Sequence, residues 1–150
     1  MRSLAVVAVA LVALSPCSAS TQSIEGAWRL AEYSSPDGPT YTDPPSLMIF
    51  ADGYYSRVFV RTNDTRQPLN EASTDADRVA AWNPFVSNSG TYTISGSTLT
   101  LLATVAKMPS TNRTPNTWEF RIEGNTLRLT GSGEGVADTR QRWVRASGGM

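Results

Sequence analysis

From residue 24 onward, hydrophobic and polar residues alternate in short runs that are separated by turn-forming residues. A period of two is typical of β-strands that bury one face. We expect each run to be a strand. The eight runs cover residues 24–33, 47–51, 54–61, 90–95, 98–106, 118–123, 126–130 and 139–145.

Three glycine-containing dipeptides join neighbouring runs, at residues 52–53, 96–97 and 124–125. Such dipeptides tolerate the positive φ of tight hairpin turns, so consecutive strands are expected to pair in a meander. Eight strands are about the smallest number that closes around an interior able to hold one small ligand, and closure removes exposed edges. The sequence therefore predicts an all-β fold, an eight-stranded antiparallel up-and-down β-barrel.

One segment, residues 70–85, lacks this alternation and is rich in alanine. Ser73 or Thr74 can cap a short helix that runs to Trp82, and Asn83-Pro84 can end it. We expect a short lid helix across one opening of the barrel.

The first 19 residues differ from the rest. Arg2 precedes an apolar run at residues 4–14, which is too short to cross a bilayer, and small residues lead up to Ala19. We expect residues 1–19 to be a cleaved signal peptide and residues 20–150 to be the barrel domain, secreted or periplasmic. An uncleaved anchor is the alternative. Cys17 lies in a lipobox-like context, so a lipoprotein tethered to a membrane through Cys17 is a further alternative.

The composition of the chain limits the partners, catalytic groups and metal ligands that it can have. Lys and Arg together number 13, as do Asp and Glu, and this zero net charge argues against a nucleic-acid partner. The chain has no histidine, and Cys17 is its one cysteine. Imidazole bases, thiol nucleophiles in the domain and the preferred ligands of zinc are therefore missing. We expect no metal and no cofactor, and enzymatic activity, although open, is the less favoured role.

Gly26-Ala27-Trp28 forms a Gly-x-Trp motif at the start of the first predicted strand, and further characteristic segments follow in order at residues 52–56, 89–92, 122–129 and 142–145. In this order the segments resemble the lipocalin-like domain family of bacteria and fungi, whose first strand opens with Gly-x-Trp. The resemblance implies an eight-stranded calycin barrel. It further implies that Gly26 opens the first strand, that Trp28 plugs the closed end, and that Arg140 or Arg142 packs over the Trp28 ring.

Glu32 is a candidate site residue. If Trp28 points inward, a period of two places Leu30 and Glu32 on the same inner face. A carboxylate in an apolar interior needs a partner, which Arg57 or Arg61 can supply. The alternative is that Glu32 lies at the strand end, in water.

Aromatic residues are the other candidates for a ligand-binding wall: Phe59, Tyr92, Trp118 and Phe120. On a neighbouring strand, Leu99, Leu101, Ala103 and Val105 share one face by alternation. Ordinary packing of a filled small barrel explains the same pattern.

Three functions follow. The leading hypothesis is an exported protein that binds a small apolar or amphipathic ligand in the barrel. The second is a barrel enzyme of the isomerase or cyclase type, with Glu32 or Tyr92 as the acid and Arg57 stabilising developing charge. The third is a structural or interaction module with a filled barrel, whose contact patch is Trp82 and Phe85.

Overall fold

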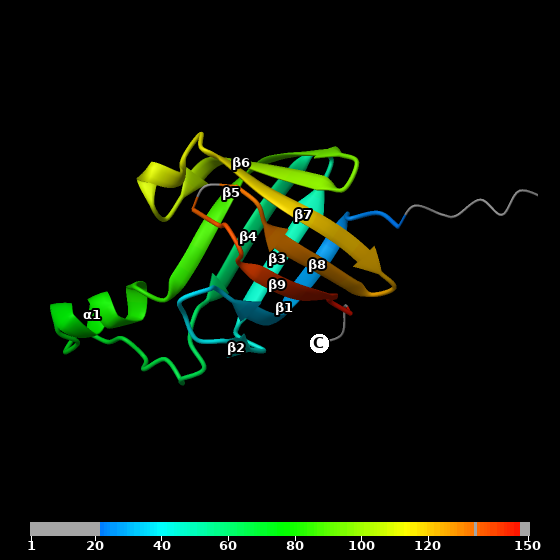
Figure 1. The fold of residues 1–150 in the computed structure, drawn as a ribbon. Coiled ribbons are helices and arrows are strands. Elements are labelled where there is room, and N and C mark those ends of the chain that lie inside the picture. Colours follow the sequence, from blue (N-terminus) through cyan, green and yellow to red (C-terminus); the bar gives the residue numbers. More distant parts are fainter. Residues whose placement is uncertain (1–21, 134, 148–150) are drawn as a thin grey trace, which may run out of the picture.

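The computed structural model describes residues 22–133 and 135–147. The predicted signal peptide and Cys17 lie outside the described residues. Nine strands and one α-helix follow one another within the described chain (Figure 1). They are β1 (Gly26–Ser34), β2 (Tyr41–Thr42), β3 (Ser46–Ala51), β4 (Tyr54–Val60), α1 (Asp75–Trp82), β5 (Phe85–Ser95), β6 (Thr98–Ala106), β7 (Pro115–Glu123), β8 (Thr126–Gly131) and β9 (Arg140–Arg145). A 3₁₀ turn, η1 (Pro109–Thr111), lies between β6 and β7.

The sheet closes on itself. From β3 to β9 each strand pairs antiparallel with the next, and β1 pairs with both β3 and β9. The predicted eight-stranded antiparallel barrel is confirmed. The two-residue strand β2, which was not predicted, pairs with the far end of β1.

Strand β5 begins at Phe85 rather than at residue 90. Its first residues carry no clear alternation, but they pair with β4 from Val60↔Phe85 through Ser56↔Ser89. Pairing with a neighbouring strand therefore makes this segment β-structure, where its own pattern does not.

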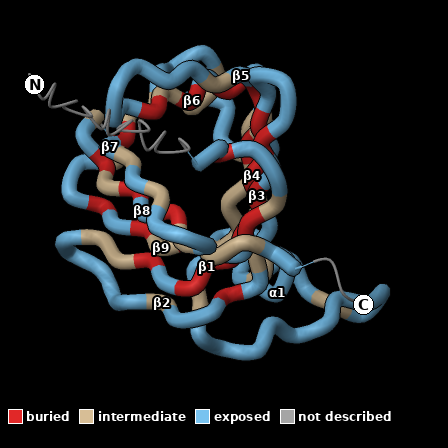
Figure 2. Tube along the Cα trace, turned by 90° about the vertical axis from the view of Figure 1, so that its right-hand side faces the viewer, coloured by how far each residue is buried: buried red, intermediate tan, exposed pale blue. Residues whose placement is uncertain are grey.

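Helix α1 begins after Thr74, as predicted. The Thr74 hydroxyl accepts a hydrogen bond from the Asp77 backbone N–H, and the Asp77 carboxylate accepts one from the Thr74 N–H, which completes a capping box. The helix ends at Trp82, also as predicted. It buries none of its residues and stands to one side of the barrel end, instead of across the opening (Figures 1 and 2). Between residues 22 and 147, residue 134 aside, the chain has no helix long and apolar enough to cross a membrane.

Buried residues line the inside of the ring of strands (Figure 2). Three tryptophans, Trp28, Trp118 and Trp143, are almost fully buried within one core cluster. Large side chains therefore occupy much of the interior, as in other small barrels.

Two irregularities change which residues face inward. The register between β1 and β9 shifts between Leu30 and Glu32, so that Ala31 is an extra residue. The register between β5 and β6 shifts between Ser89 and Gly90. Beyond this second shift Val105 turns outward and is 62% exposed, so its predicted place on the inner face is wrong.

Candidate functional site

One end of the barrel is closed by Trp28. Its ring is fully buried, and its indole N–H donates a hydrogen bond to the carbonyl oxygen of Ile24 at 2.7 Å. The Arg145 guanidinium lies 4.3 Å from the centre of the ring. Arg145 also donates hydrogen bonds to the backbone carbonyls of Glu25 (2.8 Å) and Ser23 (2.6 Å). A cation stacked on an aromatic face in this way closes the end of the barrel.

The arginine over Trp28 is neither Arg140 nor Arg142, so that prediction is wrong. The β1–β9 register places Arg145 opposite Trp28, and it places Arg140 opposite Ser34 at the other end of the strand. Arg142 contacts the Glu32 carboxylate instead. Gly26 has a φ of 112°, and a Cβ there would lie 3.0 Å from the Arg145 Nη1 atom, which explains the glycine.

Replacing Arg145 with alanine is expected to lower the free energy of unfolding by about 1–3 kcal/mol, because the cation–π contact and two hydrogen bonds are lost together. Arg142→Ala is the matched control. It removes only a largely exposed ion pair and is expected to cost less than about 1 kcal/mol. Urea denaturation of both variants measures the difference, and equal losses would contradict the assignment of Arg145 to the plug.

Glu32 faces outward. Its side chain is 49% exposed and contacts Arg142 at 3.4 Å. The extra residue Ala31 shifts the alternation by one, so that Tyr33 takes the inward position expected for Glu32. The predicted pairing of Glu32 with Arg57 inside the barrel is therefore wrong.

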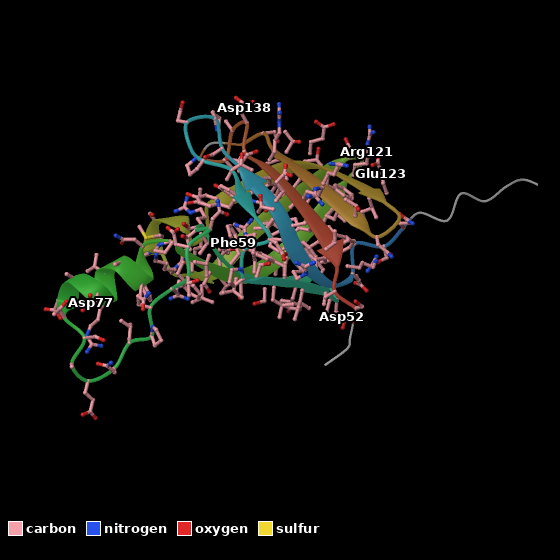
Figure 3. The ribbon with its side chains drawn as sticks, turned by 90° about the horizontal axis from the view of Figure 1, so that it is seen from below. Asp52, Phe59, Asp77, Arg121, Glu123 and Asp138 are labelled. Atoms are coloured by element: carbon pink, nitrogen blue, oxygen red, sulfur yellow. The ribbon has the colours of Figure 1, made fainter. Side chains whose placement is uncertain are left out.

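Arg57 is on the inner face of β4, between Tyr55 and Phe59. Its side chain is 6% exposed, and its guanidinium carbon lies 5.8 Å from the ring centres of both Phe59 and Trp118. In Figure 3, Phe59 lies in the region of the strands and Asp77 on the separate helix α1. The structure thus brings together three of the residues singled out from the sequence.

Arg57 has unpaired donors. Its Nε and Nη1 atoms are buried without a hydrogen-bond partner, and none of the ion pairs within residues 22–133 and 135–147 includes it. Burial lowers the pKa of Arg57, while Tyr55 and Tyr33 act in the opposite direction. An arginine nevertheless keeps its charge in a protein. The barrel therefore holds a buried cation without a counter-charge in its described part.

Asn88 on β5 lies directly opposite Arg57 in the β4–β5 register. It is 5% exposed, and its Oδ1 atom also has no hydrogen-bond partner. Asn88 was not predicted to be a site residue, because residues 85–89 were not predicted to be a strand. The only signal for Asn88 in the sequence is its residue type, because a polar side chain of this kind is seldom buried without a hydrogen-bond partner.

Tyr92 and Phe120 do not join this group. Tyr92 packs edge-on against Phe50, with ring centres 5.0 Å apart, and its hydroxyl donates to the Glu25 carboxylate at 3.4 Å. Burial, followed by the nearby Glu25 carboxylate, raises the pKa of Tyr92. Phe120 is half-buried against the core cluster. Tyr92 therefore belongs to the hairpin end of the barrel, near the turn at residues 52–53.

A cavity of about 330 Å³ opens at the end of the barrel near α1. We call it the mouth pocket. Its walls combine apolar and polar residues: Trp82, Phe85, Val86, Ala106 and Met108 on the one hand, and Arg61, Asn83, Ser87, Asn88, Lys107 and Thr111 on the other. The lining of the pocket includes Asn88, which is the cross-strand neighbour of Arg57, but it does not include Arg57 itself.

The arrangement can bind a small molecule. A cation framed by aromatic rings can hold an anionic or polar group, and the apolar walls can hold an uncharged body. No cluster of three or more His, Cys, Asp or Glu side chains that could hold a metal occurs in the described part of the chain.

The topology, together with the buried Trp28 and the arginine across its ring, decides the architecture. The chain has a lipocalin-like fold. An uncharacterized protein from Bacteroides eggerthii has a similar structure, with a TM-score of 0.50 and 12% identity over 81% of this chain and 98% of the other. A lipocalin-like protein from Bacteroides uniformis has a TM-score of 0.48 and 15% identity over 81% and 97% of the two chains. No protein-family model and no curated protein matches the sequence.

At 12% identity, the likeness to the Bacteroides eggerthii protein extends to the fold and says nothing about the ligand. The function of this lipocalin-like barrel must therefore be argued from its own interior.

Proposed function

We propose that this lipocalin-like barrel is an exported protein that binds one small amphipathic molecule, with the polar end of the ligand beside Arg57 and the apolar part directed toward the mouth pocket. The observation that carries the proposal is the buried Arg57, whose Nε and Nη1 atoms are unpaired between two aromatic rings. Export rests on the character of residues 1–19 alone.

Burying a charged group without a partner costs free energy, because the hydration of the group is lost and nothing replaces it. Buried charged groups of this kind are found preferentially at functional sites. A ligand with a polar end would offset this cost on binding, and that gain contributes directly to affinity.

The mouth pocket suits the rest of the ligand. Its volume of about 330 Å³ is near the lower end of small-molecule sites. Phe85, Val86 and Ala106 present mainly apolar surface there, and Val86 also packs against the core cluster. A ligand of modest size in the pocket would contact Asn88 and would have to extend past it to reach Arg57 on the neighbouring strand.

The neutral fluorescent probe N-phenyl-1-naphthylamine tests the proposal. We expect it to bind the mature protein with about one molecule per chain. Ala106→Trp fills the mouth pocket and should weaken binding at least about tenfold, because the bulky ring occupies the site. Val105→Trp adds the same ring to the neighbouring, exposed position and should leave binding unchanged.

Native mass spectra of protein purified from its own source should also show a discrete adduct that is lost on unfolding. If no adduct appears, and the probe does not bind or binds both variants equally, the barrel does not act as a binding protein.

A further inference from the structure

The two unpaired polar groups within the strands differ in kind. Arg57 offers a positive charge and buried N–H donors, whereas Asn88 offers a buried carbonyl oxygen that accepts. They lie side by side because β4 and β5 place them directly opposite each other. A ligand that satisfies both must carry complementary groups next to each other.

Other polar groups in the same interior are already paired. The Trp118 indole N–H donates to Asn116 at 2.6 Å, and the Trp143 N–H donates to Gln141 at 2.9 Å. The core therefore pairs polar groups where its own side chains can do so. Arg57 and Asn88 differ from these groups because each has a polar atom without a hydrogen-bond partner, and both are more than nine-tenths buried.

We propose that the ligand carries an anionic carboxylate that Arg57 binds, with an O–H or N–H group beside it that donates to Asn88. This inference rests on the proposed function and specifies the ligand class: a hydroxy acid, or a similar acid with an adjacent donor, on a short apolar body. Charge-assisted hydrogen bonds from an arginine to a carboxylate are among the stronger ones.

The choice of a carboxylate over a neutral head group follows from the surroundings. The acidic candidate from the sequence, Glu32, is on the outer surface and pairs with Arg142. The Arg57 charge therefore has no counter-ion among the described side chains, and a neutral alcohol would leave that charge uncompensated. A carboxylate supplies the counter-charge inside the barrel.

Competition against N-phenyl-1-naphthylamine tests this with three compounds that share one apolar body: 2-hydroxydecanoate, decanoate and 1-decanol. Decanoate should displace the probe roughly 10- to 100-fold more effectively than 1-decanol, as expected for hydrogen bonds to a charged group. The 2-hydroxy group should add roughly a further threefold to tenfold, as expected for one neutral hydrogen bond.

Substitutions at Arg57 and Asn88 show which side chain causes each difference between the competitors. Arg57→Met should remove the preference for decanoate over 1-decanol while the probe still binds, and Arg57→Lys should retain part of it. Asn88→Leu should remove only the advantage of the 2-hydroxy group. If the probe binds but the acid and the alcohol compete equally, or if Arg57→Met keeps the preference, the carboxylate assignment is wrong and the proposed function stands. If the probe itself does not bind, the proposed function fails.

Discussion

Replacement of Arg57 with methionine is expected to raise the free energy of unfolding of the ligand-free barrel by about 1–3 kcal/mol. Methionine has a similar length and packs adaptably, so it can fill the same space between Phe59 and Trp118. The substitution removes two buried, unpaired donors, each of which costs about 1–3 kcal/mol. It also loses two cation–π contacts, which are weak because both are near the upper limit of distance, at 5.8 Å.

The measurement is urea denaturation of protein that has been refolded to remove any bound ligand. Arg61→Met is the matched control, because Arg61 is exposed beyond the end of β4 and its replacement should change stability by no more than about 0.5 kcal/mol. A gain in stability together with a loss of acid binding is the signature of a residue kept for function. A clear loss of stability would show that Arg57 holds the core together instead.

Replacement of Trp28 with alanine is expected to lower the free energy of unfolding by about 3–5 kcal/mol. The side chain is fully buried, and its removal leaves a large cavity at the closed end of the barrel. It also leaves the Ile24 carbonyl without its indole donor and Arg145 without the ring on which it stacks.

Trp82→Ala is the matched control for Trp28→Ala. Trp82 is 55% exposed at the end of α1, so the same truncation there should change stability by about 0.5 kcal/mol or less. Thermal or urea unfolding compares the two variants. Similar effects at both positions would mean that Trp28 does not act as the plug.

The candidate site was only partly predictable. Arg57 and Phe59 were singled out on a strand whose alternation runs undisturbed from Tyr54 to Phe59, and both indeed face inward. A period of two counted from Trp28 placed Glu32 inside, but Glu32 is exposed, in line with the alternative that it lies in water. The difference is Ala31, the extra residue at the bulge, because every position after a one-residue shift changes face.

The sequence by itself determined eight of the strands, their order and the tight turns between them, but neither β2 nor the first residues of β5. Alternation and glycine-containing turns act locally: β6 spans Thr98–Ala106 as predicted, and the α1 cap at Thr74 was also foreseen. Closure into an eight-stranded barrel followed from the number of strands.

Only the tertiary structure decided the register, and with it the site. Whether Arg140, Arg142 or Arg145 meets Trp28 depends on how β9 lines up with β1. Asn88 faces Arg57 because β4 draws residues 85–89 into the sheet. Pairing between strands far apart in the chain sets these positions, and the period of a single strand carries no information about the residue that lies opposite.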